Sequence, residues 1–327
     1  MHTVLGLSPM DGVTDYPFRH ITKKYGNPDI MFTEFVSVDG LVREVPRLFQ
    51  EFRYDAQDHP IVAQIFGTHP ENFYRSTVLL CSMGFDGIDI NMGCPAKSVE
   101  ERGGGAGLIQ NPLLAKQIIQ SVQQAISDYH NGYQSPLFQS LFIPSSSIAR
   151  PITCSVKTRI GYQHNEVESW ILKLLEAQPD RIEIHGRTFT QQYGGKANWE
   201  AITQAALLCH QASVSCFGNG DIISFHDAQE KAARYQLDGI LIGRASFGNP
   251  WVFQASPPDL SWTEKFNVML EHARFYEHAY PDRFFLPMRK HLGWYVKGHP
   301  HAKELREQLY LTNSSQDVAK VLKKFTE

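Results

Sequence analysis

Residues 88–99 read IDINMGCPAKSV, and this stretch shows the pattern from which the fold of the chain is predicted. Hydrophobic and polar residues alternate from Ile88 to Asn91, as they do in a β-strand. Gly93 then interrupts the run, and Pro95 prevents the strand from continuing because it has no backbone N–H to donate. The sequence therefore predicts a strand whose end presents the thiol of Cys94.

Short apolar runs of this kind recur along the chain, each followed by turn residues and a helical stretch. We expect eight strands, at 3–8, 30–35, 61–66, 86–91, 152–157, 181–185, 214–218 and 238–242. Amphipathic helices are expected between them, at 15–25, 70–83, 112–127, 165–177, 198–211 and 224–234. Eight such units in about 250 residues predict an α/β fold, a closed parallel (β/α)8 barrel. An open doubly wound sheet is the alternative, but no GxGxxG motif follows the first strand.

The pattern of the chain changes after Pro257 and Pro258. From there to Glu327 only helical patterns occur, and two amphipathic helices are expected, at 263–280 and 283–298. We therefore expect a catalytic barrel domain over residues 1–258 and a small all-helical domain over residues 259–327.

Residues 128–151 read DYHNGYQSPLFQSLFIPSSSIARP and separate the helix expected at 112–127 from the fifth expected strand. Such barrels usually make this connection within a few residues. We expect a tolerated insertion at the amino-terminal face of the barrel, and a partner-binding loop is the alternative.

The composition of the 327 residues is that of a soluble globular protein, with 42% hydrophobic and 20% charged residues. No apolar run approaches the ~18 residues that cross a bilayer, and the N-terminus does not resemble a signal peptide. The five cysteines are scattered and form no CxxC pair, which argues against a disulfide framework and against a zinc site. A cytoplasmic location is therefore expected, with neither a membrane nor a metal as partner.

The net charge of −3 gives no general sign of nucleic-acid binding, but the charge is unevenly distributed. Between Arg283 and Arg306, six cationic residues stand against one acid, Glu304. Lysines on a helix usually form a solvated face, and Trp294 and Tyr295 in the same stretch fit the core of a helical bundle. Contacts with nucleic-acid phosphates, with Trp294 and Tyr295 as a stacking surface, are the alternative.

Polar groups follow almost every predicted strand, and in such a barrel the carboxyl ends of the strands carry the chemistry. In chain order these strand ends carry Pro9, Met10 and Asp11; Gln64; Asn91 and Cys94; Lys157 and Arg159; His185 and Arg187; Asn219, Gly220 and Asp221; Gly243 and Arg244. A barrel with a purely structural role would not need this arrangement.

The last two strand ends together predict a phosphate site. The glycine-rich turn at Gly220 exposes backbone N–H groups, and Gly243 with Arg244 opens a short helix whose positive end and guanidinium suit a phosphate. Lys157 would neutralise a second anionic centre, such as the N1–C2=O edge of a reduced flavin; a solvated rim lysine and a Schiff-base lysine are the alternatives. Gln64 either bonds a ring edge or is a barrel-interior glutamine bonded to its neighbours.

The motifs of the chain follow one another as in a known family. The segments SPMDGVTDYPFR, AQIFG, DINMGCPAKSV, GGGAGLI, SVKTRIG, IHGRTFTQQYGGKANW, GNGDI and IGRA resemble those of the tRNA-dihydrouridine synthases. The tail MRKHLGWYVKGHPHAKELREQL resembles their C-terminal helical RNA-binding domain, closest to the bacterial B-type enzymes. The resemblance covers residues 4–325 apart from the insertion, and it implies a flavin-binding barrel followed by a helical bundle.

The resemblance also implies a cofactor, a reductant and a set of site residues. Flavin mononucleotide (FMN) is expected as cofactor, NADPH as reductant and tRNA as partner. FMN is expected to contact Pro9, Met10, Asp11, Gln64, Lys157, His185, Asn219, Gly220, Asp221, Gly243 and Arg244. Cys94 is expected to be the catalytic acid, with Asn91, Arg159 and His185 near the target uracil. Tyr193 and the cationic residues Arg289, Lys290 and Lys297 are expected to approach the tRNA. Asn198 stands where the family usually has an aspartate, and it caps a helix equally well.

The expected reaction explains the cysteine. Reduction of the C5=C6 bond of uracil needs a hydride at one carbon and a proton at the other. A thiol with a pKa near ~8.5 stays protonated at pH 7 and still releases its proton to a carbanion. Cys94 is therefore expected to be neutral and to avoid electropositive surroundings; a small buried hydrophobe is the alternative role. The base must leave the RNA stack to reach the site, where Asn91 would read the imide edge with a donor and an acceptor.

Two other functions are alternatives to the reduction of uridine in tRNA. An FMN-dependent dehydrogenase of a free pyrimidine, of the dihydroorotate or dihydropyrimidine type, would use the same barrel but would leave the basic tail without a task. A tRNA-binding module without catalysis has no support, because Cys94, Lys157 and the phosphate-binding residues are all present. A monomer is expected.

Overall fold

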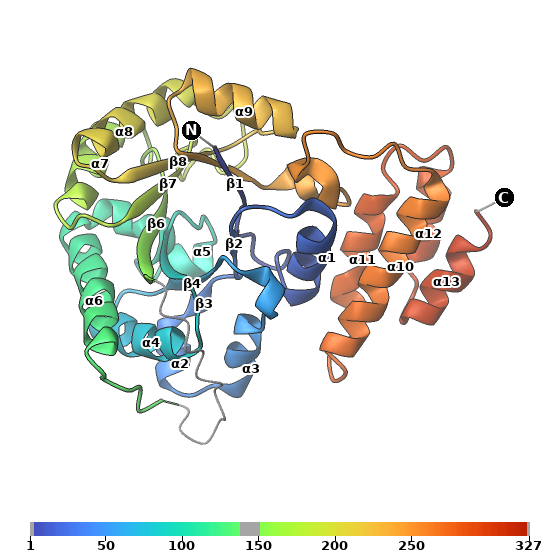
Figure 1. The fold of residues 1–327 in the computed structure, drawn as a ribbon, viewed down its shortest axis with the longest axis horizontal. Helices are drawn as coiled ribbons and strands as arrows, with labels where there is room; N and C mark the ends of the chain where they lie inside the picture. Colours follow the sequence, from blue (N-terminus) through green and yellow to red (C-terminus); the bar gives the residue numbers. More distant parts are fainter. Residues whose placement is uncertain (1–2, 138–150, 326–327) are drawn as a thin grey trace.

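A computed structural model describes residues 3–137 and 151–325 as a parallel barrel with a group of helices beside it (Figure 1). The strands are β1 (Val4–Leu7), β2 (Met31–Phe32), β3 (Val36–Ser37), β4 (Ile61–Phe66), β5 (Gly87–Met92), β6 (Thr153–Arg159), β7 (Arg181–His185), β8 (Ser215–Asn219) and β9 (Gly239–Ile242). They pair in the order β1-β9-β8-β7-β6-β5-β4-β2, and β3 also pairs with β4. A parallel bridge between Gly6 and Ile30 joins the two ends of this sheet, so the predicted barrel is confirmed.

Seven of the eight expected strands occur where they were predicted, and the second, at 30–35, is divided into β2 and β3. The break lies at Thr33, whose hydroxyl accepts the backbone N–H of Gln64 at 3.0 Å and donates to the carbonyl of Glu34 at 2.9 Å. A side-chain oxygen thus replaces a backbone acceptor of the ladder for one position. Alternation of apolar residues does not reveal such a replacement.

The six expected helices between the strands are all present. They are α1 (Tyr16–Gly26), α4 (Pro70–Ser82), α6 (Pro112–His130), α7 (Val167–Leu175), α8 (Trp199–Gln211) and α9 (Phe225–Arg234). Asn111 and Asn198 cap α6 and α8, because their side-chain oxygens accept the N–H groups of Leu114 at 3.3 Å and Ala201 at 3.0 Å.

Shorter helices fill the connections of the barrel. These are α2 (Val38–Val42), α3 (Pro46–Phe49), α5 (Lys97–Glu100) and the 3₁₀ turns η1 (Gln50–Phe52), η2 (Ala56–Asp58), η3 (Gly105–Gln110), η4 (Arg244–Ser246) and η5 (Pro250–Phe253). Helix α6 continues to His130, three residues into the expected insertion. The insertion itself is a prediction that falls mostly on residues 138–150, outside the described residues.

Four helices follow the barrel, α10 (Trp262–Ala279), α11 (Leu286–Tyr295), α12 (Ala302–Leu309) and α13 (Ser315–Leu322). The expected helical tail is therefore confirmed, and Figure 1 shows it beside α1. Its hydrophobic core also includes Tyr16 and Ile21 of α1 and Trp251 of η5. The division of the chain into two domains at residue 258 stays a prediction.

Two features are absent from the residues that the structure describes. None of their helices is long and apolar enough to cross a membrane. Nor do residues 3–137 and 151–325 contain a group of three or more His, Cys, Asp and Glu side chains that could hold a metal ion.

Candidate active site

A cleft of about 1390 Å³ opens at the carboxyl ends of the strands and extends to the C-terminal helices. It brings together nearly all the residues that the sequence singled out: Pro9, Met10, Asp11, Gln64, Asn91, Cys94, Lys157, Arg159, His185, Tyr193, Asn219, Gly220, Asp221, Gly243, Arg244 and Lys297. Arg289 and Lys290 are not among its lining residues. Phe247 and Lys265, which were not predicted to belong to the site, also line the cleft, as does Trp294, for which stacking on the RNA was one of two alternatives.

The thiol of Cys94 sits in a tight turn directly after β5. Both the Gly93 and the Cys94 backbone N–H donate to the side-chain oxygen of Asn91, at 3.1 and 2.9 Å. The Cys94 Sγ lies 3.5 Å from the backbone N of Ala96, which donates to it. Burial raises the pKa of the Cys94 thiol above its ordinary value, so the group is neutral at pH 7. Cys94 is half-buried, whereas Cys81, Cys154, Cys209 and Cys216 are all buried.

Asn91 has less freedom to bind a substrate than the sequence suggested. Its oxygen accepts two N–H groups of the turn, and its Nδ2 donates to Gln64 Oε1 at 3.0 Å. An amide oxygen offers two lone pairs and an amide nitrogen two hydrogens. One N–H of Asn91 therefore remains for a substrate carbonyl, and the expected reading of both a donor and an acceptor is reduced to a single donor.

Arg159 binds the loops of the site together. Its guanidinium is buried, with Nε donating to the Gly93 carbonyl at 2.7 Å and Nη1 to the carbonyls of Thr188 at 3.0 Å and Gln192 at 3.1 Å. Burial lowers the pKa of Arg159 to about 10, which leaves it charged at pH 7. This cation therefore fixes the Cys94 turn against the loop after β7, next to the exposed ring of Tyr193.

A cation and a neutral imidazole lie close to Arg159, on β6 and on the neighbouring strand β7. The Lys157 ammonium donates to Asn219 Oδ1 at 3.2 Å, and burial lowers the pKa of Lys157 to about 8. Burial, reinforced by Arg159, Lys157, Arg187 and Arg244, holds the pKa of His185 well below its usual range. Arg187 Nη1 lies 3.3 Å from His185 Nε2, and an arginine N–H can only donate. His185 is thus neutral, with its proton on Nδ1.

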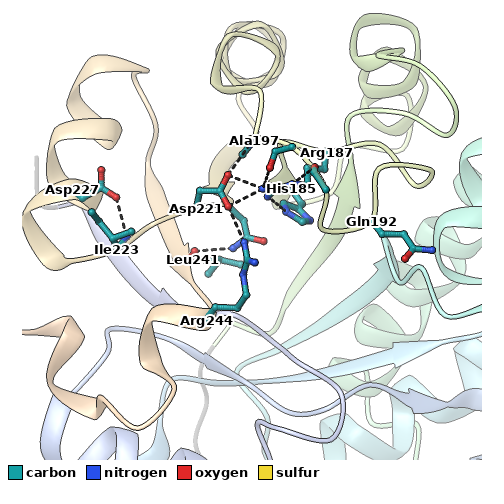
Figure 2. A network of polar contacts seen from close by, with 12 residues as sticks. His185, Arg187, Gln192, Ala197, Asp221, Ile223, Asp227, Leu241 and Arg244 are labelled. Carbon is teal, nitrogen blue, oxygen red and sulfur yellow. Dashed lines mark hydrogen bonds and ion pairs between the residues drawn. The ribbon is translucent and has the colours of Figure 1, made fainter. Parts of the chain in front are cut away.

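Asp221, which follows β8, is held between Arg187 after β7 and Arg244 after β9 (Figure 2). Its carboxylate accepts Arg187 Nη2 at 2.8 and 2.9 Å, Arg244 Nη2 at 2.8 Å and the Ala197 N–H at 2.8 Å. Arg187 is almost wholly buried, while the Arg244 side chain is 53% exposed. Asp221 therefore orients Arg244 toward the cleft. The sequence placed Arg187 at a strand end but did not assign it a role.

Backbone N–H groups suited to an anion lie beside these arginines. Those of Asp221, Ile222, Arg244 and Ala245 have no hydrogen-bond partner within residues 3–137 and 151–325. Gly220 has a φ of +131°, and a Cβ there would lie 2.7 Å from the Cβ of Ala197, so the turn requires glycine. The short helix expected after the last strand is the 3₁₀ turn η4. Free N–H groups beside an exposed guanidinium can bind a phosphate.

The cations of the tail have different surroundings. Arg289 donates to the Thr312 carbonyl at 2.8 Å and to Asn313 Oδ1 at 2.7 Å, which anchors the connection between α12 and α13. Lys290 donates to the carbonyl of Gly12, in the loop after β1. Lys297 is exposed at the edge of the cleft. Of the three cations expected to approach tRNA, Lys297 is the one placed to meet a ligand in the cleft.

Comparison with known proteins gives the family of this barrel. The fold and the site define a parallel α/β barrel with an anion-binding mouth and a neutral thiol. The sequence model of the family described as Dihydrouridine synthase (Dus) matches residues 6–132 and 145–327. The chain belongs to this family, as its motifs predicted.

Curated relatives match over almost the whole chain. A probable tRNA-dihydrouridine synthase of Staphylococcus aureus is 32% identical over 326 residues, which cover 98% of this chain and 92% of that protein. Probable tRNA-dihydrouridine synthase 2 of Bacillus subtilis is 31% identical and covers 98% of this chain and 93% of its own length.

Two solved structures share the fold at low sequence identity. Dihydroorotate dehydrogenase (DHODH) of Eimeria tenella, in complex with ferulenol, has a TM-score of 0.52 and 13% identity, with 83% of this chain and 82% of that one covered. Histamine dehydrogenase of Rhizobium sp. 4-9 has a TM-score of 0.51 and 12% identity, with 76% and 44% covered. The alternative function, a dehydrogenase of a free pyrimidine, is therefore supported only by similarity of fold, and the comparisons do not favour it.

Proposed function

We propose that this protein reduces the C5=C6 bond of uridines in tRNA to give dihydrouridine. The observation that carries the proposal is the half-buried neutral thiol of Cys94, held on a turn beside an anion-binding cleft in a chain of the dihydrouridine synthase family. FMN, the proposed cofactor, supplies a hydride to one carbon when it is bound in its reduced form, and NADPH is the proposed source of its electrons.

The residues present fit the phosphate of such a cofactor. The free N–H groups of Asp221, Ile222, Arg244 and Ala245 and the exposed guanidinium of Arg244 would bind it. The other proposed contacts line the same cleft: Pro9, Met10, Asp11, Gln64, Lys157, His185, Asn219, Gly220 and Gly243. The Lys157 ammonium would neutralise negative charge on the ring.

Cys94 would supply the proton of the reaction. The Sγ–H bond breaks as a C–H bond forms at C5 of the uracil, and a thiolate remains on Cys94 until solvent protonates it again. The positive charge of Arg159 favours that thiolate, as its effect on the Cys94 pKa shows. The remaining N–H of Asn91 would bind a uracil carbonyl and orient the ring.

The target uridine would leave the RNA stack to enter the cleft. The exposed ring of Tyr193 and the exposed ammonium of Lys297 lie at the edge of that cleft, where they would contact the tRNA. We also propose that the protein acts as a monomer and in the cytoplasm.

Nucleoside mass spectrometry tests this function directly. Unmodified tRNA is incubated with the protein, FMN and NADPH, and we expect uridine to gain two hydrogens. The Cys94→Ala variant should retain its flavin and bind tRNA but lose turnover. If tRNA is unchanged while free pyrimidines are reduced at the expense of NADPH, the protein is a small-molecule dehydrogenase.

A further inference from the structure

A line of buried polar side chains runs inside the barrel to the Cys94 turn. Gln64 Nε2 donates to Asp89 Oδ2 at 2.7 Å, and Asn91 Nδ2 donates to Gln64 Oε1 at 3.0 Å. The Asn91 oxygen then accepts the N–H groups of Gly93 and Cys94. Asp89 is wholly buried, Gln64 is 1% exposed and Asn91 is 7% exposed, so little water competes for these bonds.

The direction of each bond in this line is fixed from its buried end. An ionised carboxylate can only accept hydrogen bonds, whereas an amide side chain can turn over and exchange donor for acceptor. Asp89 therefore forces Gln64 to present its nitrogen to Asp89 and its oxygen to Asn91. Asn91 must in turn present its nitrogen to Gln64 and its oxygen to the turn. Reversal of Asn91 would place its NH2 group against the backbone N–H groups of the Cys94 turn, and reversal of Gln64 would place its NH2 group against that of Asn91.

Both carboxylate oxygens of Asp89 accept hydrogen bonds from neighbouring side chains. Ser155 Oγ donates to Asp89 Oδ1 at 2.7 Å, which supplies the second oxygen with a donor. Glu183 lies beside Asp89, and burial together with the negative charge of Asp89 raises the pKa of Glu183 to about 8. Glu183 therefore holds its proton at pH 7, while its Oε1 accepts Arg181 Nε at 2.6 Å.

We propose that Asp89 is a positioning residue that sets the orientation of the Cys94 proton donor through Gln64 and Asn91. Asp89 does not line the cleft, so it acts only through these two amides. The consequence for turnover rests on the proposed function, but the consequence for the Cys94 thiol does not.

The test uses the isosteric Asp89→Asn variant of the full-length flavin-loaded protein. Its new amide no longer dictates the direction of Gln64. Iodoacetamide reports on Cys94 because the other four cysteines are buried. We expect the pH profile of alkylation to move to lower pH as the turn loosens and Cys94 becomes more exposed. Reduction of tRNA should fall by about a hundredfold, the size of effect expected when a reacting group is misplaced, with unchanged flavin content and tRNA affinity.

Two variants make the result specific. Ser155→Ala removes a buried hydrogen bond to the other oxygen of Asp89 but leaves the direction of Gln64 fixed, so the alkylation profile and turnover should stay within about twofold of wild type. In the double variant Asp89→Asn/Gln64→Glu, residue 64 carries the carboxylate and can only accept. Asn91 then keeps its direction, and the wild-type alkylation profile should return.

The outcomes separate the two proposals. A wild-type alkylation profile in a folded Asp89→Asn variant would overturn the positioning role, whatever happens to turnover. The same holds if Asp89→Asn and Ser155→Ala shift the profile equally, or if the double variant does not restore it. If Asp89→Asn does not fold, the double variant alone tests the positioning role. It should fold with a wild-type alkylation profile only if the direction of the hydrogen bonds of residue 64 and Asn91 is what positions Cys94. Absence of tRNA reduction by the wild-type protein would refute the proposed function and leave the alkylation result standing.

Discussion

The indole of Trp294 stacks on the ring of Phe247, with centroids 4.0 Å apart and planes inclined by 14°. Phe247 follows η4, which carries Arg244, and Trp294 belongs to α11. Next to the stack, Gly248 has a φ of +64°, and a Cβ on it would lie 2.4 Å from the carbonyl carbon of Trp294. The loop of the proposed phosphate site is therefore packed directly on the helical tail.

Replacement of Gly248 should separate these two parts of the molecule. In Gly248→Ala the methyl group meets the backbone of α11 and the backbone keeps a strained positive φ, so we expect a loss of about 1 to 3 kcal/mol in the free energy of unfolding. Flavin retention should fall as well. Gly298→Ala is the matched control, since Gly298 has a φ of +88° but nothing within 4 Å of its Cβ position. Equal losses for both variants, measured by denaturant unfolding, would refute a role for the close contact.

Lys290 and Lys297 should respond differently when each is replaced by alanine. Lys297 is exposed at the cleft, so Lys297→Ala should weaken tRNA binding and reduce the slope of log K against log salt by about one. Lys290 donates to Gly12, so Lys290→Ala should lower the unfolding temperature and leave that salt slope unchanged. Binding measured at several salt concentrations decides between them. A reduced slope for Lys290→Ala would mean that its ammonium reaches a phosphate in the complex.

The two arginines on Asp221 should also differ. Arg244 is half-exposed, so Arg244→Ala should release flavin with little change in protein stability. Arg187 is buried and also donates to the carbonyls of Gly194 at 3.1 Å and Gly195 at 2.7 Å. Arg187→Ala should therefore cost about 2 to 3 kcal/mol of stability, because it removes the donor to these carbonyls and the buried one of the two arginines that Asp221 binds. Flavin content and urea unfolding measure the two effects, and full flavin occupancy in Arg244→Ala would contradict the phosphate site.

Glu34 should make the stability of the protein depend on pH. Burial, then the charges of Asp15 and Glu51, raise the pKa of Glu34 from 4.5 to about 8. Since the folded state holds this proton more tightly, the associated stability is complete below pH 4.5 and is lost as the pH rises through 8. The unfolding temperature should therefore fall less steeply between pH 5 and pH 8 in Glu34→Gln than in the wild-type protein. Glu304→Gln, at an exposed position, controls for the change in net charge, and equal slopes in all three proteins would rule out the effect.

The sequence predicted the parts of the fold that depend on local pattern. Helix caps such as Asn198 depend on neighbouring residues alone, and so does the strand that precedes Cys94. The division of the second strand depends on a hydroxyl of Thr33 that bonds Gln64, 31 positions away in sequence. The role of Arg187 and the attachment of Lys290 to Gly12 likewise depend on distant backbone atoms, for which a single sequence carries no signal.

The ring of strands is bonded unevenly around its circumference. β5 and β6 pair over six residues, whereas β1 and the segment before β2 meet at the bridge between Gly6 and Ile30. Transient opening costs least where the fewest backbone bonds must break, so amide deuteration should begin at this seam. Helix α1 connects the two strands of the seam, and Tyr16 and Lys24 of α1 contact Phe275 and Glu271 of α10. Through these contacts with α1, the helical tail therefore stabilises the closed form of the barrel.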